Sequence, residues 1–349
     1  MTENTIDYPE GGTLYIKGER DRMSGEPSDY YKVGIVRGEK EARDRDGALR
    51  TGNPRAITTL FELQTPFVQR LETRLHNEFA PGRISSGEWF HESLVPVTEV
   101  QARATSLGAE LNDKAEAISF SEAEDGPGEA PAVGATADMM DLVSRLSALG
   151  SELKAVSSLT KEVEKALQDA ATEEPSLREV YFKRSERGPT SSLSATEVKK
   201  RFPELYDQFV ESVEAAPRKK WSLPELEASH DVALSARGLP ETVEVEALAS
   251  DPSSLHQLYL RAWAAASVVK WEQWLLTAEL SFLAQGTQGI EGIFHWEARS
   301  SKTFNKKAFE AAHPAVAEEC TVQKPASVSY SPAEWLVPLG ALDGLAPAS

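Results

Sequence analysis

The stretch LETRLHNEFAPGRISSGEWF, residues 71–90, holds two side chains that can carry acid–base or metal chemistry. Glu72 and His76 are four residues apart, so on a helix they lie on one face. Glu72 directly follows Leu71, which belongs to an apolar stripe, so its carboxylate is expected to flank that stripe. Such a carboxylate is either a solvated charge paired with Lys or Arg, or a ligand for a divalent cation. His76 can transfer a proton, bind phosphate or pack at the edge of the stripe.

Short strands and helices must position these side chains. Segments rich in Tyr, Ile, Val and Phe, bounded by Gly and Pro, indicate strands. Apolar residues at Phe67, Leu71, Leu75 and Phe79 recur every four positions, which is typical of an amphipathic helix. The predicted strands are 12–17, 30–36, 57–63 and 87–91, and the predicted helices are 39–50 and 65–79. This order predicts a compact α+β module.

Five pieces of this module stand in the order of a known motif set: GTLYI (12–16), YKVGI (31–35), RDGALRTGNP (45–54), LETRLHNEF (71–79) and SGEWF (86–90). Through these five pieces, residues 12–92 resemble the GIY-YIG nuclease superfamily. The resemblance is to the branch common in phages and bacteria whose second motif reads KIG. The match covers about a quarter of the chain. The resemblance implies a small mixed sheet flanked by helices, and hydrolysis of DNA phosphodiester bonds that depends on Mg²⁺ or Mn²⁺.

The resemblance also implies roles for single residues. Glu72 would be the metal ligand, and one carboxylate can be the whole protein contribution because Mg²⁺ fills its other positions with water and phosphate. Arg45 would hold a phosphate oxygen, with Arg43 as the competing choice. Tyr15 would be the base or would position the attacking water. The alternatives are an exposed, paired arginine and a tyrosine packed in the core.

The second motif departs from the commonest family pattern. Many members carry a tyrosine where this chain has Lys32, with Tyr31 just before it. Adjacent strand residues face opposite sides. Either Lys32 enters the cleft as a cation that lowers the pKa of a neighbouring phenol, or Tyr31 faces the cleft in a different register. The candidate catalytic residues are Tyr15, Lys32, Arg45, Glu72 and His76, and the candidate metal ligand is Glu72.

Composition limits the other classes of function. The net charge of −18 argues against a broad electrostatic grip on nucleic acid, although residues 1–93 carry only −3 of it. The single Cys320 excludes an intramolecular disulfide framework and a cysteine-based zinc cluster. No membrane span or signal segment is evident, so a cytoplasmic protein is expected. The basic cluster 217–220 (PRKK) is typical of a solvated loop, with nucleic-acid contact as the alternative.

The remainder of the chain is predicted to be mainly helical. Residues 119–137 have the Gly, Pro, Ala and Glu content of a flexible linker. Apolar residues on 3-4 spacing from 139 to 167 predict a coiled-coil-like helix. Its partner is either a second copy of the chain, giving a homodimer, or a later helix of the same chain. An offset of 113 residues, with a two-residue slip further on, relates this region to 252–320. That relation indicates an internal duplication or two unrelated units of similar period.

Together these patterns predict an α+β protein with an N-terminal nuclease-like domain and a helical C-terminal region. The expected divisions are 1–95 (nuclease-like domain), 96–137 (helix and linker), 138–215 (helical unit 1), 216–251 (connector) and 252–349 (helical unit 2 and tail). The expected function is a DNA endonuclease whose helical region serves assembly or target selection. The alternative is a non-catalytic, oligomeric scaffold that keeps the nuclease-like fold and binds nucleic acid or protein.

Overall fold

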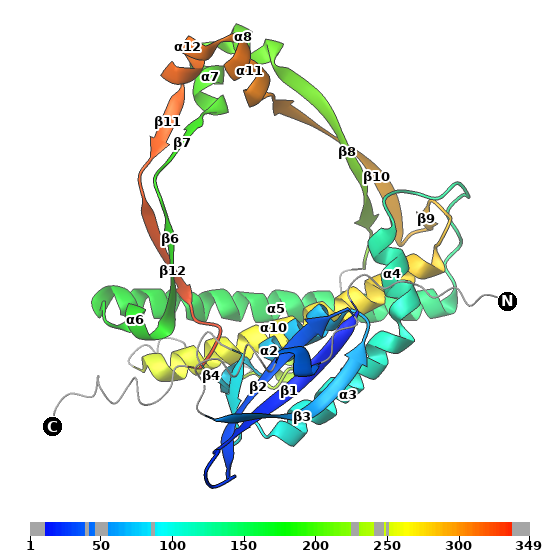
Figure 1. Cartoon of the computed structure of the whole chain (residues 1–349). Coiled ribbons are helices and arrows are strands. Elements are labelled where there is room, and N and C mark those ends of the chain that lie inside the picture. Colours follow the sequence, from blue (N-terminus) through cyan, green and yellow to red (C-terminus); the bar gives the residue numbers. More distant parts are fainter. Residues whose placement is uncertain are drawn as a thin grey trace.

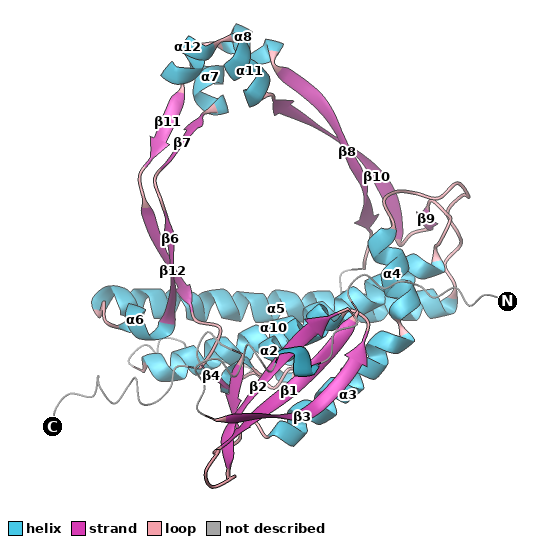
Figure 2. Cartoon of the chain, viewed as in Figure 1, coloured by secondary structure: helices cyan, strands magenta, loops and turns pink. Residues whose placement is uncertain are grey.

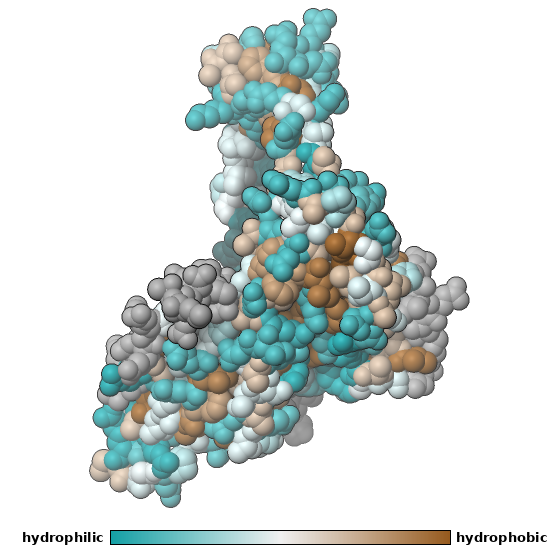
Figure 3. Space-filling model, turned by 90° about the vertical axis from the view of Figure 1, so that its right-hand side faces the viewer, coloured by the Kyte–Doolittle hydropathy of each residue, from teal (hydrophilic) through white to brown (hydrophobic). Residues whose placement is uncertain are grey.

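The computed structural model describes residues 11–38, 42–45, 55–84, 88–224, 230–240, 248 and 251–336. The fold is mixed α/β. A small N-terminal sheet with its helices lies against two long helices, and from these helices a hoop of β-ribbons rises to a helical tip (Figures 1 and 2). Seen edge-on, the hoop is a narrow projection above a broader base (Figure 3).

The N-terminal sheet has the strand order β3-β1-β2-β5-β4. Every pairing in it is antiparallel, so the expectation of a mixed sheet is wrong. The β1–β2 hairpin returns through a short turn, whereas β3 and β5 reach β1 and β2 through longer connections that also bring the chain back in the opposite direction. The strands are β1 (Gly12–Arg20), β2 (Pro27–Arg37), β3 (Ala56–Thr65), β4 (Arg83–Ile84) and β5 (Trp89–His91).

Helix α2 (Val68–Glu78) covers one face of this sheet. All four residues of the predicted stripe, Phe67, Leu71, Leu75 and Phe79, are buried, which confirms the periodicity. The opposite face carries the short 3-10 helix η1 (Ala42–Arg45). The rest of the helix predicted at 39–50 lies outside the described residues. After η2 (Ala80–Gly82), the chain continues into α3 (Val97–Asp113) and α4 (Ala115–Ala123).

The two long helices α5 (Ala137–Glu173) and α10 (Pro252–Leu283) pack along each other. The predicted seam of α5 is buried in this contact, including Leu142, Leu146 and Val163. The partner of the seam is therefore a later helix of the same chain, and the seam offers no free apolar stripe to a second copy. Helix α10 also enters the N-terminal core through Trp271, Leu275 and Ala278, so residues 1–95 share their core with it.

Two antiparallel ribbons form the sides of the hoop. We call the first the serine arm: it pairs β6 with β12 and β7 with β11. The long arm pairs β8 with β10, and β10 also pairs with β9. The serine-arm strands are β6 (Phe182–Arg187), β7 (Thr190–Leu193), β11 (Thr321–Lys324) and β12 (Ser327–Pro332). The other strands are β8 (Val210–Trp221), β9 (Gly289–Ile290) and β10 (Phe294–Phe304).

Four short helices close the hoop around a small apolar core that contains Val198, Phe304 and Phe309. These tip helices are α7 (Ala195–Arg201), α8 (Pro203–Gln208), α11 (Lys306–Ala312) and α12 (Pro314–Glu319). Two further short helices, α6 (Leu177–Tyr181) and α9 (His230–Ser235), lie near the base.

The element order long helix, strand, helix, helix, strand occurs twice along the chain. Helices α7 and α8 begin at 195 and 203, and α11 and α12 begin 111 residues later, at 306 and 314. Strand β8 spans 210–221, and β11 and β12 together span 321–332 at the same offset. This offset of 111 residues is the predicted offset of 113 residues reduced by the two-residue slip. Strands are exchanged between the halves, because each arm pairs strands from both.

Two sequence expectations differ from the structure. Residues 119–123 belong to α4, and 128–133 form hydrogen bonds with 286–291, so the segment predicted as a flexible linker is anchored. Its small residues allow this close approach: a Cβ at Gly128 would come within 1.9 Å of the Gly286 carbonyl carbon. The cluster 217–220 lies in strand β8 and not in a loop. Among the described residues, no helix has the length and apolar character needed to cross a membrane.

Candidate active site

Tyr15 and Gly34 lie opposite each other on the central strands of the sheet. Tyr15 is buried on the face that η1 covers, packed with Val36 and Ala42. Its ring lies directly over Gly34: a Cβ at position 34 would come within 2.6 Å of the Tyr15 hydroxyl oxygen. Glycine is therefore required here by close approach. This contact explains why the YKVGI motif holds a glycine across from the tyrosine.

The alternation of side chains along β2 decides whether Lys32 or Tyr31 shares a face with Tyr15. Tyr31 packs in the core beneath α2, and its hydroxyl donates a 2.7 Å hydrogen bond to the Val95 carbonyl. Burial raises the pKa of Tyr31, so it stays a neutral phenol. Lys32 lies on the opposite face, which it shares with Gly34 and the Tyr15 ring. Its Nζ lies 2.8 Å from Glu88 Oε2 as an ion pair.

Lys17 is a residue that the sequence analysis missed. It lies two positions after Tyr15 on β1, and so on the same face, directly opposite Lys32. Its side chain is 1% exposed, and its Nζ donates a 2.8 Å hydrogen bond to the Ala42 carbonyl. The same Nζ lies 5.2 Å from the centroid of the Tyr15 ring. Lys17 therefore places positive charge beside this phenol, and Lys32 lies on the same face.

The arginine expected to hold phosphate lies at the end of η1. Ala42, at the start of η1, packs on Tyr15, so the backbone of this short helix lies over the candidate face. Arg45 is the last residue of η1, and its side chain lies outside the described residues. Arg43, the competing choice, is exposed. The backbone of η1 therefore lies next to Tyr15.

Glu72 lies on α2, which packs on the other face of the sheet. Gln69, Glu72 and His76 share one side of this helix by their spacing. Both neighbours of Glu72 contact β2: Arg37 Nη2 donates to Gln69 Oε1 at 2.6 Å, and His76 Nε2 lies 3.2 Å from the Val33 carbonyl oxygen. The pairing of β5 with β2 covers only 30–32. The half-buried Glu72 lies between these two contacts, on the side of α2 that faces β2.

His76 is held as a packing residue. It is buried, its ring lies against Phe90, and its Nε2–H donates to the Val33 carbonyl. Burial, aided by the nearby Arg83 charge, lowers the pKa of His76 to about 4. The ring is therefore neutral near pH 7. These contacts favour a role in fixing α2, and with it Glu72, against β2.

Metal-ligating side chains do not gather in the described part of the chain: it contains no group of three or more His, Cys, Asp or Glu placed to hold one ion. A site that uses one carboxylate does not need such a group. Glu72 offers the hard oxygen ligand that Mg²⁺ and Mn²⁺ accept.

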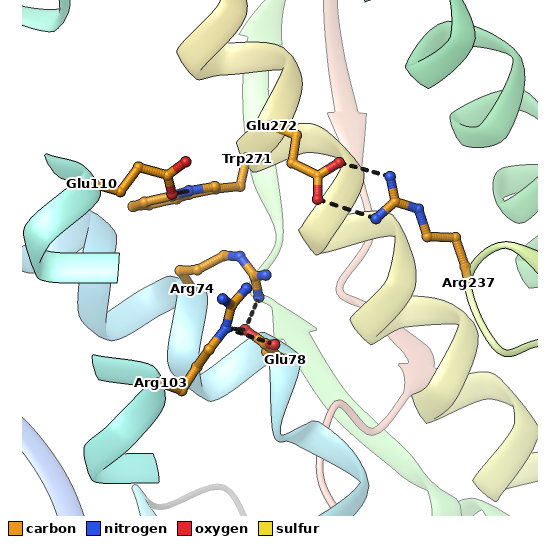
Figure 4. A network of polar contacts seen from close by, with 7 residues as sticks. All are labelled: Arg74, Glu78, Arg103, Glu110, Arg237, Trp271 and Glu272. Carbon is orange, nitrogen blue, oxygen red and sulfur yellow. Dashed lines mark hydrogen bonds and ion pairs between the residues drawn. The ribbon is translucent and has the colours of Figure 1, made fainter. Parts of the chain in front are cut away.

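A separate set of polar contacts ties α2 to α3 and α3 to α10 (Figure 4). Glu78 receives two 3.0 Å hydrogen bonds from Arg103 Nε, one to each carboxylate oxygen, and it forms a 2.6 Å ion pair with the buried Arg74. On α10, Glu272 pairs with Arg237, and Trp271 donates to Glu110. A pocket of about 450 Å³ lies beside this network, between α2 and α10.

Comparison with protein-family models, with curated proteins and with solved structures found no match for this chain.

Proposed function

We propose that this chain is a metal-dependent endonuclease that hydrolyses DNA phosphodiester bonds at the face of β1 and β2. The observation that carries the proposal is the set of groups on and beside these strands. Tyr15 lies over Gly34, Lys17 and Lys32 share its face, and Glu72 lies across the sheet on the side of α2 that faces β2. The motif pieces 12–16, 31–35 and 71–79 lie on two paired strands and the helix that covers them, which supports the GIY-YIG-like proposal for residues 12–92.

Each group has a chemical task in this proposal. Tyr15 orients the attacking water or accepts its proton, since adjacent cations favour the deprotonated form of a phenol. Lys17 and Lys32 attract the phosphate and offset charge that develops on it. Arg45 holds a phosphate oxygen from η1. Glu72 would bind Mg²⁺ or Mn²⁺, which when bound stabilises the leaving oxygen.

A plasmid-nicking assay with Mg²⁺ tests the proposal. Glu72→Gln keeps the size of the side chain and removes its charge, so nicking should fall by a factor of 100 or more, about 3 kcal/mol of transition-state stabilisation. Glu116→Gln is the matched control, because Glu116 is exposed on α4. Loss of nicking in both variants, or in neither, would reject the assignment.

The second candidate is a non-catalytic scaffold that binds nucleic acid through the same face. Two observations favour it: Lys32 stands where many family members have a tyrosine, and it is ion-paired with Glu88. In that case wild type and Glu72→Gln bind DNA equally, and neither nicks it. Freeing Lys32 with Glu88→Gln would then strengthen binding.

The helical region serves target selection in our proposal, and its two halves derive from a duplication. The common offset of 111 residues across two tip helices and a strand supports this origin. Because the arms exchange strands, the hoop needs both halves. Deleting residues 252–349 should therefore abolish cooperative unfolding of the remaining hoop elements.

A further inference from the structure

Positive charge is concentrated in the hoop. The segments 182–221 and 294–332 carry 14 Lys/Arg and 10 Asp/Glu, for a net charge of +4, although the whole chain carries −18. The rest of the chain therefore carries −22. An acidic protein that keeps its cations on one projecting element directs polyanions to that element.

The serine arm is exposed on both faces, and so is most of the long arm above its base. Apart from Phe182 and Pro332 at the base and Leu193 at the tip, every residue of the serine arm is exposed. A two-stranded ribbon with no apolar face is only marginally stable by itself. It is held here by its two ends: Ala333 N donates to the Tyr181 carbonyl at the base, and the apolar tip core lies at the other end. Its faces are available to a partner.

The two faces of the serine arm differ in charge. By the register of β6 with β12, Lys183 pairs with Ser331, Ser185 with Ser329 and Arg187 with Ser327. Paired and alternate residues share a face. This face, which we call the serine–cation face, thus holds two cations and four hydroxyls and no acid. Within the described chain, neither Lys183 nor Arg187 is in an ion pair.

Several other cations of the arms are paired with acids. On the reverse face of the serine arm, Arg184 pairs with Glu186. On the long arm, Arg218 and Lys220 both pair with Glu297, and Lys219 pairs with Glu124. On the serine–cation face, by contrast, two cations stand among four hydroxyls, and no carboxylate shares the face.

We propose that the serine–cation face binds the phosphate backbone of double-stranded DNA. Lys, Arg and Ser side chains are among the groups that contact DNA phosphates, and such contacts carry no sequence information. Lys183 and Arg187 are four residues apart, roughly 13 Å along the strand. One DNA strand carries a phosphate every ~3.4 Å of helix axis. The two cations can therefore reach different phosphates of one strand and fix the register of the hoop on the duplex.

This inference rests on the proposed function in taking DNA as the partner, but its test needs no cleavage. The full-length Glu72→Gln variant is titrated with a labelled random-sequence duplex in EDTA, over a salt range of about 50 to 200 mM. Each phosphate contact contributes about 0.9 to the slope of log affinity against log salt. Lys183→Ser/Arg187→Ser should lower the slope by about 1.8, and at about 0.1 M salt it should weaken binding on the order of ten-fold per contact.

The control removes the same charge elsewhere. Arg184→Ser lies on the reverse face, and Lys165→Ser lies on the exposed side of α5, where Lys165 pairs with Asp169. This double control should keep the wild-type slope. An unchanged slope in Lys183→Ser/Arg187→Ser, or an equal loss in the control, overturns the proposal. So does a preference of the face for anionic vesicles over duplex. If wild type does not nick DNA but the salt slopes of the Lys183→Ser/Arg187→Ser variant and the control still differ, only the nuclease function is refuted.

Discussion

Replacing Gly34 by alanine tests the geometry of the Tyr15 face. The added Cβ would come within 2.6 Å of the Tyr15 hydroxyl oxygen, 2.7 Å of Cζ and 2.9 Å of Cε2. Tyr15 is 3% exposed and packed against Val36 and Ala42, so its ring has little room to move aside. Overpacking of this kind costs about 1–3 kcal/mol. We expect Gly34→Ala to lower the free energy of unfolding in urea by that amount.

Activity should fall more than stability. Because the clash is with the hydroxyl end of Tyr15, the ring must shift by a sizeable fraction of an ångström, and a misplacement near 1 Å can cost about 100-fold in rate. Nicking measured where the variant is fully folded separates the two effects. Gly150→Ala is the control: no atom lies within 4 Å of its Cβ position in α5, so the change should be neutral or stabilising by up to about 1 kcal/mol. A Gly34→Ala protein as stable and as active as wild type would refute the placement of Tyr15 over Gly34.

Further predictions concern acid stability and the network on α2. Burial lowers the pKa values of His76 and His256, so the unfolded chain binds these protons more readily and stability declines as the pH falls below 6.5; for His76 the decline extends toward pH 4. For His76 the loss of folding stability by pH 5 is about 2 kcal/mol. His76→Gln keeps a hydrogen-bond donor to the Val33 carbonyl but does not titrate, so the difference between its urea midpoints at pH 7 and pH 5 should be smaller than in wild type. An equal difference would contradict the buried, neutral ring. Glu78→Gln leaves Arg74 and Arg103 without their carboxylate and should cost about 3 kcal/mol in urea unfolding, whereas Arg74→Met leaves Glu78 paired with Arg103 and should cost under about 1 kcal/mol. The reverse ranking would show that Arg74, and not Glu78, organises the network.

Local pattern predicted the N-terminal elements because their apolar spacing is regular. The stripe from Phe67 to Phe79 defined α2 and its buried side. Pattern could not choose between Tyr31 and Lys32, since the phase of β2 depends on which face α2 covers. Lys17 was missed because a lysine is ordinarily solvated, and its burial depends on the Ala42 carbonyl, which is 25 positions away.

The hoop could not be predicted for a different reason. Strands exposed on both faces have no apolar alternation, so β6 and β8 lack the usual strand signal. The residues 217–220 therefore appeared to be a basic loop. The seam of α5 was visible in the sequence, but only the folded chain shows that α10 fills it. The two halves of the helical region share few identical residues. Their relation at an offset of 111 residues became clear from the bounds of their helices and strands.

The central claim is that the Tyr15 face hydrolyses DNA with a metal ion held by Glu72. The most direct measurement is Mg²⁺-dependent nicking of supercoiled plasmid by full-length wild type, Glu72→Gln and Glu116→Gln, with folding checked by circular dichroism. We predict nicking by wild type and Glu116→Gln, abolished by EDTA, and at least about 100-fold slower nicking by Glu72→Gln. Equal nicking by all three proteins, or none by folded wild type, would contradict the account.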